Sequence, residues 1–185
     1  MEYKITLSSK TIIMSVALIL LQTFSLQTLG YDSNIPDDLD LEDEILQLLG
    51  GGIRNEYFVD IYHVSLYSDA KSIEEIQRAD ISHHVAIRIK ILTDILPDTP
   101  PPYWMNLFGE ILNQKQFELF TDSYSKLNNG DVLAINYIPG KGTDIFMKKE
   151  KLLVIKENYL IAAVVKSFIG ANPVSDDLKD SILKS

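Results

Sequence analysis

The sequence predicts an α+β fold in which a curved antiparallel sheet carries a layer of helices on one face. Strand-like segments follow one another with short turns over residues 132–155, which is the pattern of an antiparallel meander. Helical segments fall into two groups, one after the central strand and one at the C-terminus. No internal repeat is present, and 185 residues with 46% hydrophobic content are enough for one domain with a sizeable core.

The first 30 residues have the pattern of a secretory signal peptide. Lys4 and Lys10 precede an apolar run over residues 11–29, and Thr28 and Gly30 are small residues near a plausible cleavage point. An uncleaved N-terminal anchor and a core helix remain as alternatives, although polar residues within the run make it a poor membrane span. We therefore expect an exported protein, periplasmic or secreted, that contacts a membrane only through this segment.

Residues 31–44 form an acidic lead-in to a domain that we expect to span residues 45–185. The lead-in holds seven carboxylates and one proline, a composition typical of a mobile segment. Its alternating acidic residues lack the glycine that a calcium-binding loop needs for its sharp turn. We therefore expect a solvated segment and no calcium site.

Three consecutive glycines, Gly50–Gly52, are expected to form a turn after a short strand at residues 45–49, because glycine adopts positive φ without steric cost. Arg54 follows at the mouth of the next strand. That strand, Tyr57–Tyr67, is rich in aromatic and β-branched residues and has no clearly polar face, so we expect both faces to be covered. Arg54 and Tyr62 then place a guanidinium and a phenol in an apolar environment, which suits an anionic, mostly apolar small molecule.

A short connecting helix is expected from Ser72 to Ala79, because Ser72 can cap it and two glutamates occupy its first turn. The strand His84–Leu92 alternates apolar and polar residues, so one face packs and the other faces water. His83 and His84 are neighbours on this strand and are expected to point to opposite faces. We therefore expect no metal site there.

Two amphipathic helices are expected after this strand. The proline run at residues 99–102 cannot lie inside a helix but can precede one, and residues 103–113 then carry apolar side chains at helical spacing. A second helix, residues 116–127, places three aromatic side chains on one face before an Asn-Asn-Gly-Asp turn ends it. Aromatic residues on such helices are more often part of the core than of a ligand site.

The C-terminal part returns to strand and then to helix. The helix at residues 158–170 is apolar on nearly every face and must be largely buried. Gly170 ends it, and a last polar helix capped by Ser175 follows. The strands before it are expected at residues 132–138, 143–147 and 152–155.

Two motifs frame the glycine-rich segment and the strand after it, namely Gly-Gly-Ile-Arg at residues 51–54 and Val-Ser-Leu-Tyr at residues 64–67. Later pieces follow in order: an Asn-Gly-Asp turn at residues 129–131, a hairpin at residues 137–142, and a closing helix followed by Pro173. In this order the pieces resemble the chalcone isomerase-like family from about Glu44 to the C-terminus. The resemblance implies an open-faced sandwich with a ligand cleft between the sheet and the helices.

The resemblance also implies site residues. The family's enzymes add a phenolate across the double bond of a chalcone, and Arg54 takes the place of the arginine that holds the anionic oxygen. Tyr62 stands where these enzymes have a threonine. On the following helix, Asn113 takes the place of a family asparagine and Asn106 that of a tyrosine. Tyr103, one turn earlier, can substitute for that tyrosine only if the helix is shifted.

These matches favour a binding protein over a chalcone isomerase, because at most two of five functional positions match and the family's hydroxyl residue is missing near Glu150. The first hypothesis is an exported, non-catalytic protein that binds a fatty acid or similar amphipathic carboxylate through Arg54 and Tyr62, as related family members bind fatty acids. The alternative is an intramolecular lyase or isomerase acting on an enone, with Arg54 stabilising the oxyanion. A pure interaction module, and a structural Arg54 that caps the glycine turn, also remain open.

Composition narrows the classes of function further. A net charge of −9 and the lack of a basic patch argue against nucleic-acid binding. The chain has no cysteine, which excludes disulfides, thiol chemistry and cysteine metal sites. No nucleophile elbow, metalloprotease motif or nucleotide-binding loop occurs. We therefore expect no cofactor and no metal, and a small amphipathic molecule as the partner.

Overall fold

The computed structural model describes residues 35–77 and 81–184. The expected signal peptide, residues 1–30, lies outside the described residues. Within them, no helix is long and apolar enough to cross a membrane.

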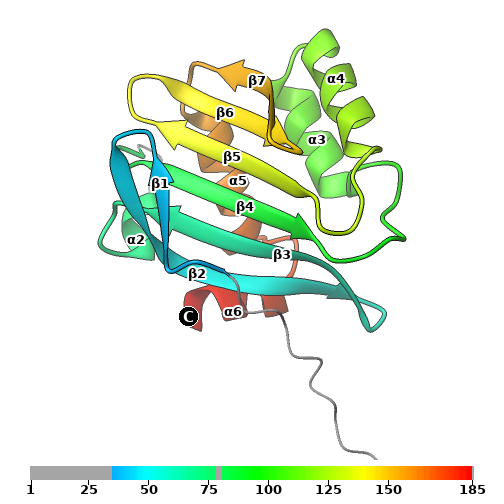
Figure 1. Cartoon of the computed structure of the whole chain (residues 1–185), viewed down its shortest axis with the longest axis horizontal. Coiled ribbons are helices and arrows are strands. Elements are labelled where there is room, and N and C mark those ends of the chain that lie inside the picture. Colours follow the sequence, from blue (N-terminus) through cyan, green and yellow to red (C-terminus); the bar gives the residue numbers. More distant parts are fainter. Residues whose placement is uncertain (1–34, 78–80, 185) are drawn as a thin grey trace, which may run out of the picture. The chain divides into compact units, whose positions relative to one another are not determined.

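Seven strands form one antiparallel sheet in which each strand pairs with the next along the chain (Figure 1). This confirms the curved antiparallel sheet of the expected α+β fold. The strands are β1 (Asp38–Leu41), β2 (Glu44–Glu56), β3 (Val59–Ser68), β4 (Val85–Ile91), β5 (Val132–Ile138), β6 (Gly142–Met147) and β7 (Glu150–Ile155).

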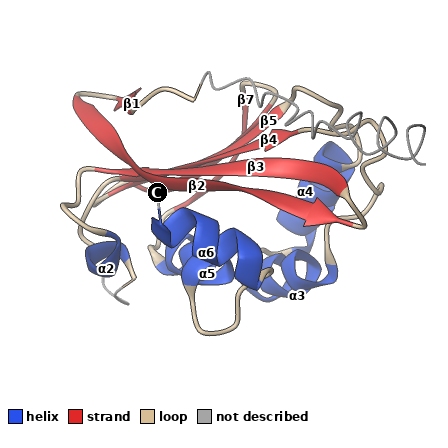
Figure 2. Ribbon diagram, turned by 90° about the horizontal axis from the view of Figure 1, so that it is seen from below, coloured by secondary structure: helices blue, strands red, loops and turns tan. Residues whose placement is uncertain are grey.

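The helices cover one face of the sheet, as the sequence predicts (Figure 2). The main hydrophobic core lies between the two layers, where α5 buries eight of its residues against the sheet. Its apolar composition leaves no other stable position for this helix. The helices are α2 (Ile73–Ile76), α3 (Pro102–Ile111), α4 (Gln114–Tyr124), α5 (Tyr159–Ile169) and α6 (Asp176–Lys184).

The three glycines lie inside β2 and form no turn, which corrects the sequence-based expectation. None of them has positive φ. Two of them are needed because α6 lies directly on the strand: a Cβ atom on Gly50 would be 2.1 Å from the carbonyl oxygen of Ile182, and one on Gly52 would be 2.8 Å from the Cβ of Ser181. Glycine therefore serves close packing between a helix and a strand rather than chain reversal.

The acidic lead-in, which was expected to be a mobile, solvated segment, is partly structured. Asp38–Leu41 forms β1 and pairs with the start of β2. Leu41 and Leu46 pack with Tyr67 in a small second core on the sheet face opposite the main helix layer. The Tyr67 hydroxyl group also donates a hydrogen bond to the carbonyl oxygen of Pro36, at 3.1 Å. Alternating leucines make these packing contacts. The sequence-based prediction missed them because the surrounding carboxylates indicated a solvated segment.

The β2–β3 hairpin turns at Tyr57 and Phe58, which were expected to open the following strand. Both residues have positive φ, 48° and 68°, and Glu56 pairs with Val59 across the turn. This is the geometry of a two-residue hairpin turn. The strand composition of the two aromatic residues hid the turn, because such turns usually hold asparagine and glycine.

The two neighbouring histidines point to the same side chain, so their expected placement on opposite faces was wrong. His83 Nδ1 lies 3.2 Å and His84 Nδ1 2.7 Å from the two carboxylate oxygens of Asp69. Both residues precede β4, which begins at Val85, so strand alternation does not apply to them. Among residues 35–77 and 81–184, no group of three or more acidic, histidine or cysteine side chains could hold a metal ion.

Candidate functional site

A cleft of about 540 Å³ opens at the end of the β2–β3 hairpin. Its walls are the hairpin, the loop at residues 95–102, the start of α3 and the end of α4. Prolines in the loop keep this wall stiff, because each proline fixes its own φ. The size and the mainly apolar lining are those of a site for a small apolar molecule.

Arg54 and Tyr62 both line this cleft and lie directly opposite each other in the pairing of β2 with β3. The register shifts between Arg54 and Asn55, whose partners are Tyr62 and Asp60. Ile61 is therefore the extra residue of a β-bulge, a feature that bends a strand pair and redirects side chains near sites. The structure thus brings together the two residues that the sequence singled out first.

Arg54 makes an ion pair within the cleft. Its Nη2 atom lies 2.6 Å from Oε1 of Glu56, and its Nη1 atom donates a hydrogen bond to the carbonyl oxygen of Asn55 at 3.1 Å. The Arg54 side chain is 24% exposed. It does not cap a glycine turn, so that structural explanation of Arg54 is corrected. Glu56 is the internal counter-ion that an anionic ligand has to displace or share.

Two phenol groups face the same region. Burial raises the pKa of Tyr62 well above its usual value, more than the nearby Arg54 lowers it. Burial also raises the pKa of Tyr124 to about 12, with Glu56 adding to the shift. No hydrogen bond joins either hydroxyl group to another described residue. Both phenols therefore stay protonated at neutral pH and can donate hydrogen bonds to a bound anion.

Tyr62 is held in place by aromatic packing. Its ring lies 6.3 Å from the Trp104 ring at an interplanar angle of 29°, and Trp104 contacts Phe108 and Phe168 edge-on. Each of these aromatic pairs adds to the stability of the core. The phenol is consequently fixed at the inner wall of the cleft, where the sheet meets α3.

The other residues expected at the site divide into one that lines the cleft and two that do not. Tyr103, at the start of α3, forms part of the wall. Asn106 is exposed outside it. Asn113 caps α4: its side-chain oxygen accepts a hydrogen bond from the backbone N–H of Gln116, and the Gln116 side chain accepts one from the backbone N–H of Asn113. This reciprocal pair is a capping box, a structural arrangement.

Sequence reasoning missed Glu56 and Tyr124. Glu56 stands two residues after Arg54 on one strand, so strand alternation puts both on the same face, and this signal was available. Tyr124 was recognised as part of an aromatic helix face, but its approach to Tyr62 and Glu56 depends on how α4 packs. The loop at residues 95–102 has no strand or helix pattern, so its position beside the cleft could not be predicted from the sequence.

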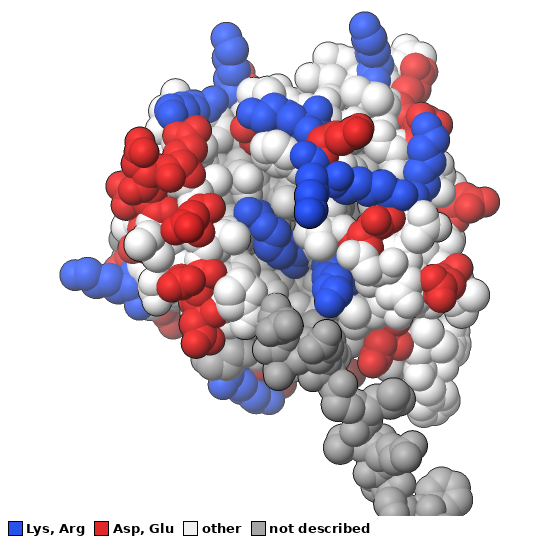
Figure 3. All heavy atoms as spheres, viewed as in Figure 1, with Lys and Arg blue, Asp and Glu red and all other residues white. Residues whose placement is uncertain are grey.

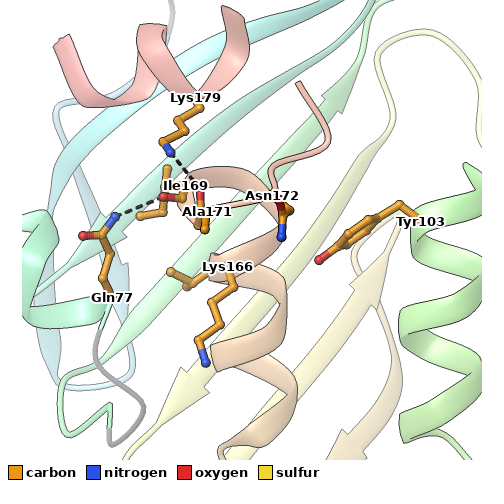
Figure 4. A pocket seen from close by; sticks show the side chains of 9 residues that line it. Gln77, Tyr103, Lys166, Ile169, Ala171, Asn172 and Lys179 are labelled. Atoms are coloured by element: carbon orange, nitrogen blue, oxygen red, sulfur yellow. Dashed lines mark hydrogen bonds between the residues drawn. The ribbon is translucent and has the colours of Figure 1, made fainter. Parts of the chain in front are cut away.

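A second hollow, of about 580 Å³, lies at the C-terminal end of α5 and shares Tyr103 with the cleft (Figure 4). Two of its polar side chains hold the last carbonyl groups of the helix region. Gln77 donates a hydrogen bond to the carbonyl oxygen of Ile169 at 3.1 Å, and Lys179 donates one to that of Gly170 at 2.7 Å. These contacts satisfy a helix end, so they are structural.

The structure is an open-faced sandwich with a ligand-sized cleft, and the side chains that line this cleft include the guanidinium group of Arg54 and several tyrosine phenols. The chain belongs to the chalcone isomerase-like family, whose family model matches residues 30–184. A fatty-acid binding protein of Arabidopsis thaliana has a similar crystal structure, with a TM-score of 0.55 and 16% sequence identity over 80% of this chain and 90% of that chain. This identity supports a shared fold. No curated protein matches the sequence.

Proposed function

We propose that the protein binds a fatty acid or a similar amphipathic carboxylate, without catalysis, in the cleft beside β2 and β3. The observation that carries the proposal is the placement of Arg54 opposite Tyr62 at an otherwise largely apolar cleft. The guanidinium and the protonated phenols of Tyr62 and Tyr124 can all donate hydrogen bonds to a carboxylate. The hydrocarbon chain then lies along the apolar wall at residues 95–102.

Two further points support this function. The similar Arabidopsis protein is a fatty-acid binding protein. The ion pair of Arg54 with Glu56 also shows that the guanidinium already holds a carboxylate group in this environment. A ligand carboxylate can take the same position with the same geometry. We propose as well that the protein is exported, to the periplasm or the exterior, which the N-terminal sequence of the purified chain would test.

Expression of the 185-residue chain in an exporting host allows a direct test. Gentle purification followed by native mass spectrometry and organic extraction should give a stoichiometric fatty acid or similar carboxylate. Arg54→Gln should raise the dissociation constant of palmitate by roughly 10- to 100-fold, because it removes a charge-assisted hydrogen bond. Asn106→Ala is the matched control, since Asn106 lies outside the cleft. Unchanged palmitate binding in Arg54→Gln would remove the head-group role.

An intramolecular lyase or isomerase acting on an enone is the second candidate, because Arg54 and the two phenols could also stabilise an oxyanion. An assay that incubates the purified protein with a chalcone and monitors the absorbance of the chalcone over time distinguishes the two functions. The binding proposal predicts no turnover above the uncatalysed rate. Turnover that is lost in Arg54→Gln but kept in Asn106→Ala would favour the enzyme.

A further inference from the structure

Three exposed apolar residues, Tyr57, Phe58 and Ile95, lie on the hairpin turn and on the loop that form two walls of the cleft, and we call them the apolar rim. Tyr57 is 94% exposed and Phe58 100%, the highest values for aromatic side chains among the described residues. Ile95, on the loop that forms another wall of the cleft, is 71% exposed. Tyr57 and Ile95 both line the cleft, and Phe58 is the other turn residue of the hairpin. Exposed apolar groups gathered at one site mark an interaction surface more often than scattered ones do.

The turn itself does not require aromatic residues. Tyr57 and Phe58 have positive φ, a conformation that bulky side chains disfavour and that asparagine and glycine adopt readily. The turn between β6 and β7 supplies an internal comparison, because Lys148 and Lys149 there have similar φ values of 52° and 72°. Those lysines are exposed, as is usual for a hairpin turn in water. The aromatic pair therefore needs an explanation other than chain reversal.

The hairpin is braced just behind its tip. Arg54 pairs with Glu56, and the Asn55 side chain donates a hydrogen bond across the hairpin to Oδ1 of Asp60 at 3.0 Å. The Asn55–Asp60 bond joins the two strand ends below the strained turn, whereas the Arg54–Glu56 ion pair links side chains within β2. Strained residues persist where their surroundings fix them, and they concentrate at functional sites. At the tip of this braced hairpin, the Tyr57 and Phe58 side chains are almost fully exposed.

We propose that the apolar rim inserts into the surface of a zwitterionic phospholipid bilayer, so that the cleft opens onto the membrane. Tyrosine settles at the boundary between lipid and water, whereas phenylalanine and isoleucine favour the acyl-chain side of that boundary. Three side chains are too few for a stable protein interface, which takes about 800 Å² from each partner. They are enough for a wedge that enters lipid.

The charged residues near the rim indicate which type of membrane surface it would contact. Each charged residue of the brace is matched by its partner or by a neighbouring amide, and the chain carries a net charge of −9. On the sheet face shown in Figure 3, lysine and arginine gather over the middle of the sheet and not at the corner where the β2–β3 hairpin turns. Binding to an anionic surface usually relies on clustered basic residues beside the docking site. A zwitterionic surface imposes no such requirement.

Docking of the rim places the mouth of the cleft at the depth of the lipid chains. An apolar ligand can then pass between the bilayer and the cleft without crossing water, which matters for a molecule of low solubility. The inference holds whether or not Arg54 binds a carboxylate, because the rim is exposed without any ligand. It also adds a membrane contact to the one expected from the N-terminal segment.

Depth-dependent fluorescence quenching on the full chain tests the proposal. Phe58→Trp and Ile45→Trp are compared on phosphatidylcholine vesicles with brominated acyl chains. Ile45 is a matched control because it is 61% exposed near the other end of β2, and Trp104, the single natural tryptophan, is 2% exposed and gives a constant background. We expect a blue shift and strong quenching at position 58 and neither at position 45. This difference reports depth even if the N-terminal segment brings both variants to the vesicle.

A second variant separates the aromatic side chains from the fold of the hairpin. Tyr57→Asn with Phe58→Gly installs the preferred turn residues, so the hairpin should fold at least as well. In that background Ile95→Trp should lose most of the quenching that it shows with Tyr57 and Phe58 present. No quenching at position 58, equal quenching at position 45, or unchanged quenching at position 95 would overturn the proposal. A dimer that the Asn-Gly variant abolishes, seen by analytical ultracentrifugation, would assign the rim to a second copy and overturn it as well.

Discussion

Replacement of Glu56 by glutamine should tighten the binding of a carboxylate ligand. Glu56 Oε1 lies 2.6 Å from Arg54 Nη2, so an incoming carboxylate meets an internal group of the same charge. Two carboxylates about 4–5 Å apart repel each other by about 1–4 kcal/mol at effective dielectric constants between 20 and 80. The Glu56 side chain is 49% exposed, so solvent screening reduces the net effect to about 1 kcal/mol. The palmitate dissociation constant should therefore fall about fivefold.

Isothermal titration calorimetry with palmitate at low and high salt measures this change. The gain should shrink at high salt, because ions screen a partly exposed pair. Glutamine keeps the size of the side chain and an oxygen that can accept a hydrogen bond from Arg54, so the variant removes mainly the charge. A fatty alcohol of the same chain length is the control ligand, and its affinity should not depend on residue 56.

Two results would refute the competition between Glu56 and the ligand. A weaker palmitate affinity in Glu56→Gln would mean that the carboxylate orients the guanidinium and does not compete. An equal gain for palmitate and the fatty alcohol would mean that the substitution changed the shape of the cleft and not its charge. The double variant Arg54→Gln/Glu56→Gln completes the cycle, since the gain should disappear once the guanidinium is gone.

Three other predictions concern stability. Asn113→Ala should lower the free energy of unfolding by about 1 kcal/mol through loss of the helix cap and leave palmitate affinity unchanged, as urea unfolding and calorimetry will show. Gly52→Ala should cost about 1–3 kcal/mol in urea unfolding, because its Cβ would lie 2.8 Å from the Ser181 Cβ; Gly109→Ala, with no contact under 3.7 Å, is the control and should not destabilise. Burial, with Lys90 adding, lowers the pKa of His63 from 6.5 to about 4, so its protonation favours the unfolded chain. Stability should be full above pH 6.5 and fall by on the order of 3 kcal/mol as the pH drops to 4, a loss that His63→Gln should remove in urea unfolding at each pH.

The fold could be predicted because its elements obey local rules. Alternation predicted a strand at residues 84–92, and β4 covers Val85–Ile91. The proline run marked the start of α3, and the fully apolar α5 had to be covered by the sheet. Three features escaped because they depend on contacts far apart in the sequence. Gly50 and Gly52 of β2 leave room for α6, which lies more than 120 residues later in the sequence. The leucines of β1 pack on Tyr67. The aromatic turn runs against local preference, so no local rule could find it.

The site divides in the same way. Arg54 and Tyr62 were within reach of sequence reasoning because both belong to one hairpin. Asn106 and Asn113 were transferred by counting positions along a helix, and the structure puts them outside the cleft. An asparagine three residues before a glutamine, as in Asn113 and Gln116, is itself the sequence signature of a capping box. This signature could have predicted the structural role of Asn113.

The glycines also explain why Arg54 is available to a ligand. Gly50, Gly52 and Arg54 follow one another at every second position of β2, so they share the face of the sheet on which α6 lies. The helix sits on the two glycines at backbone distance, and its contacts with these positions come from Leu178, Ser181 and Ile182. Arg54 is the next position of that face after the two glycines, and its long side chain lines the cleft. Close packing of α6 and an accessible guanidinium are thus two results of the same short run of sequence, Gly-Gly-Gly-Ile-Arg.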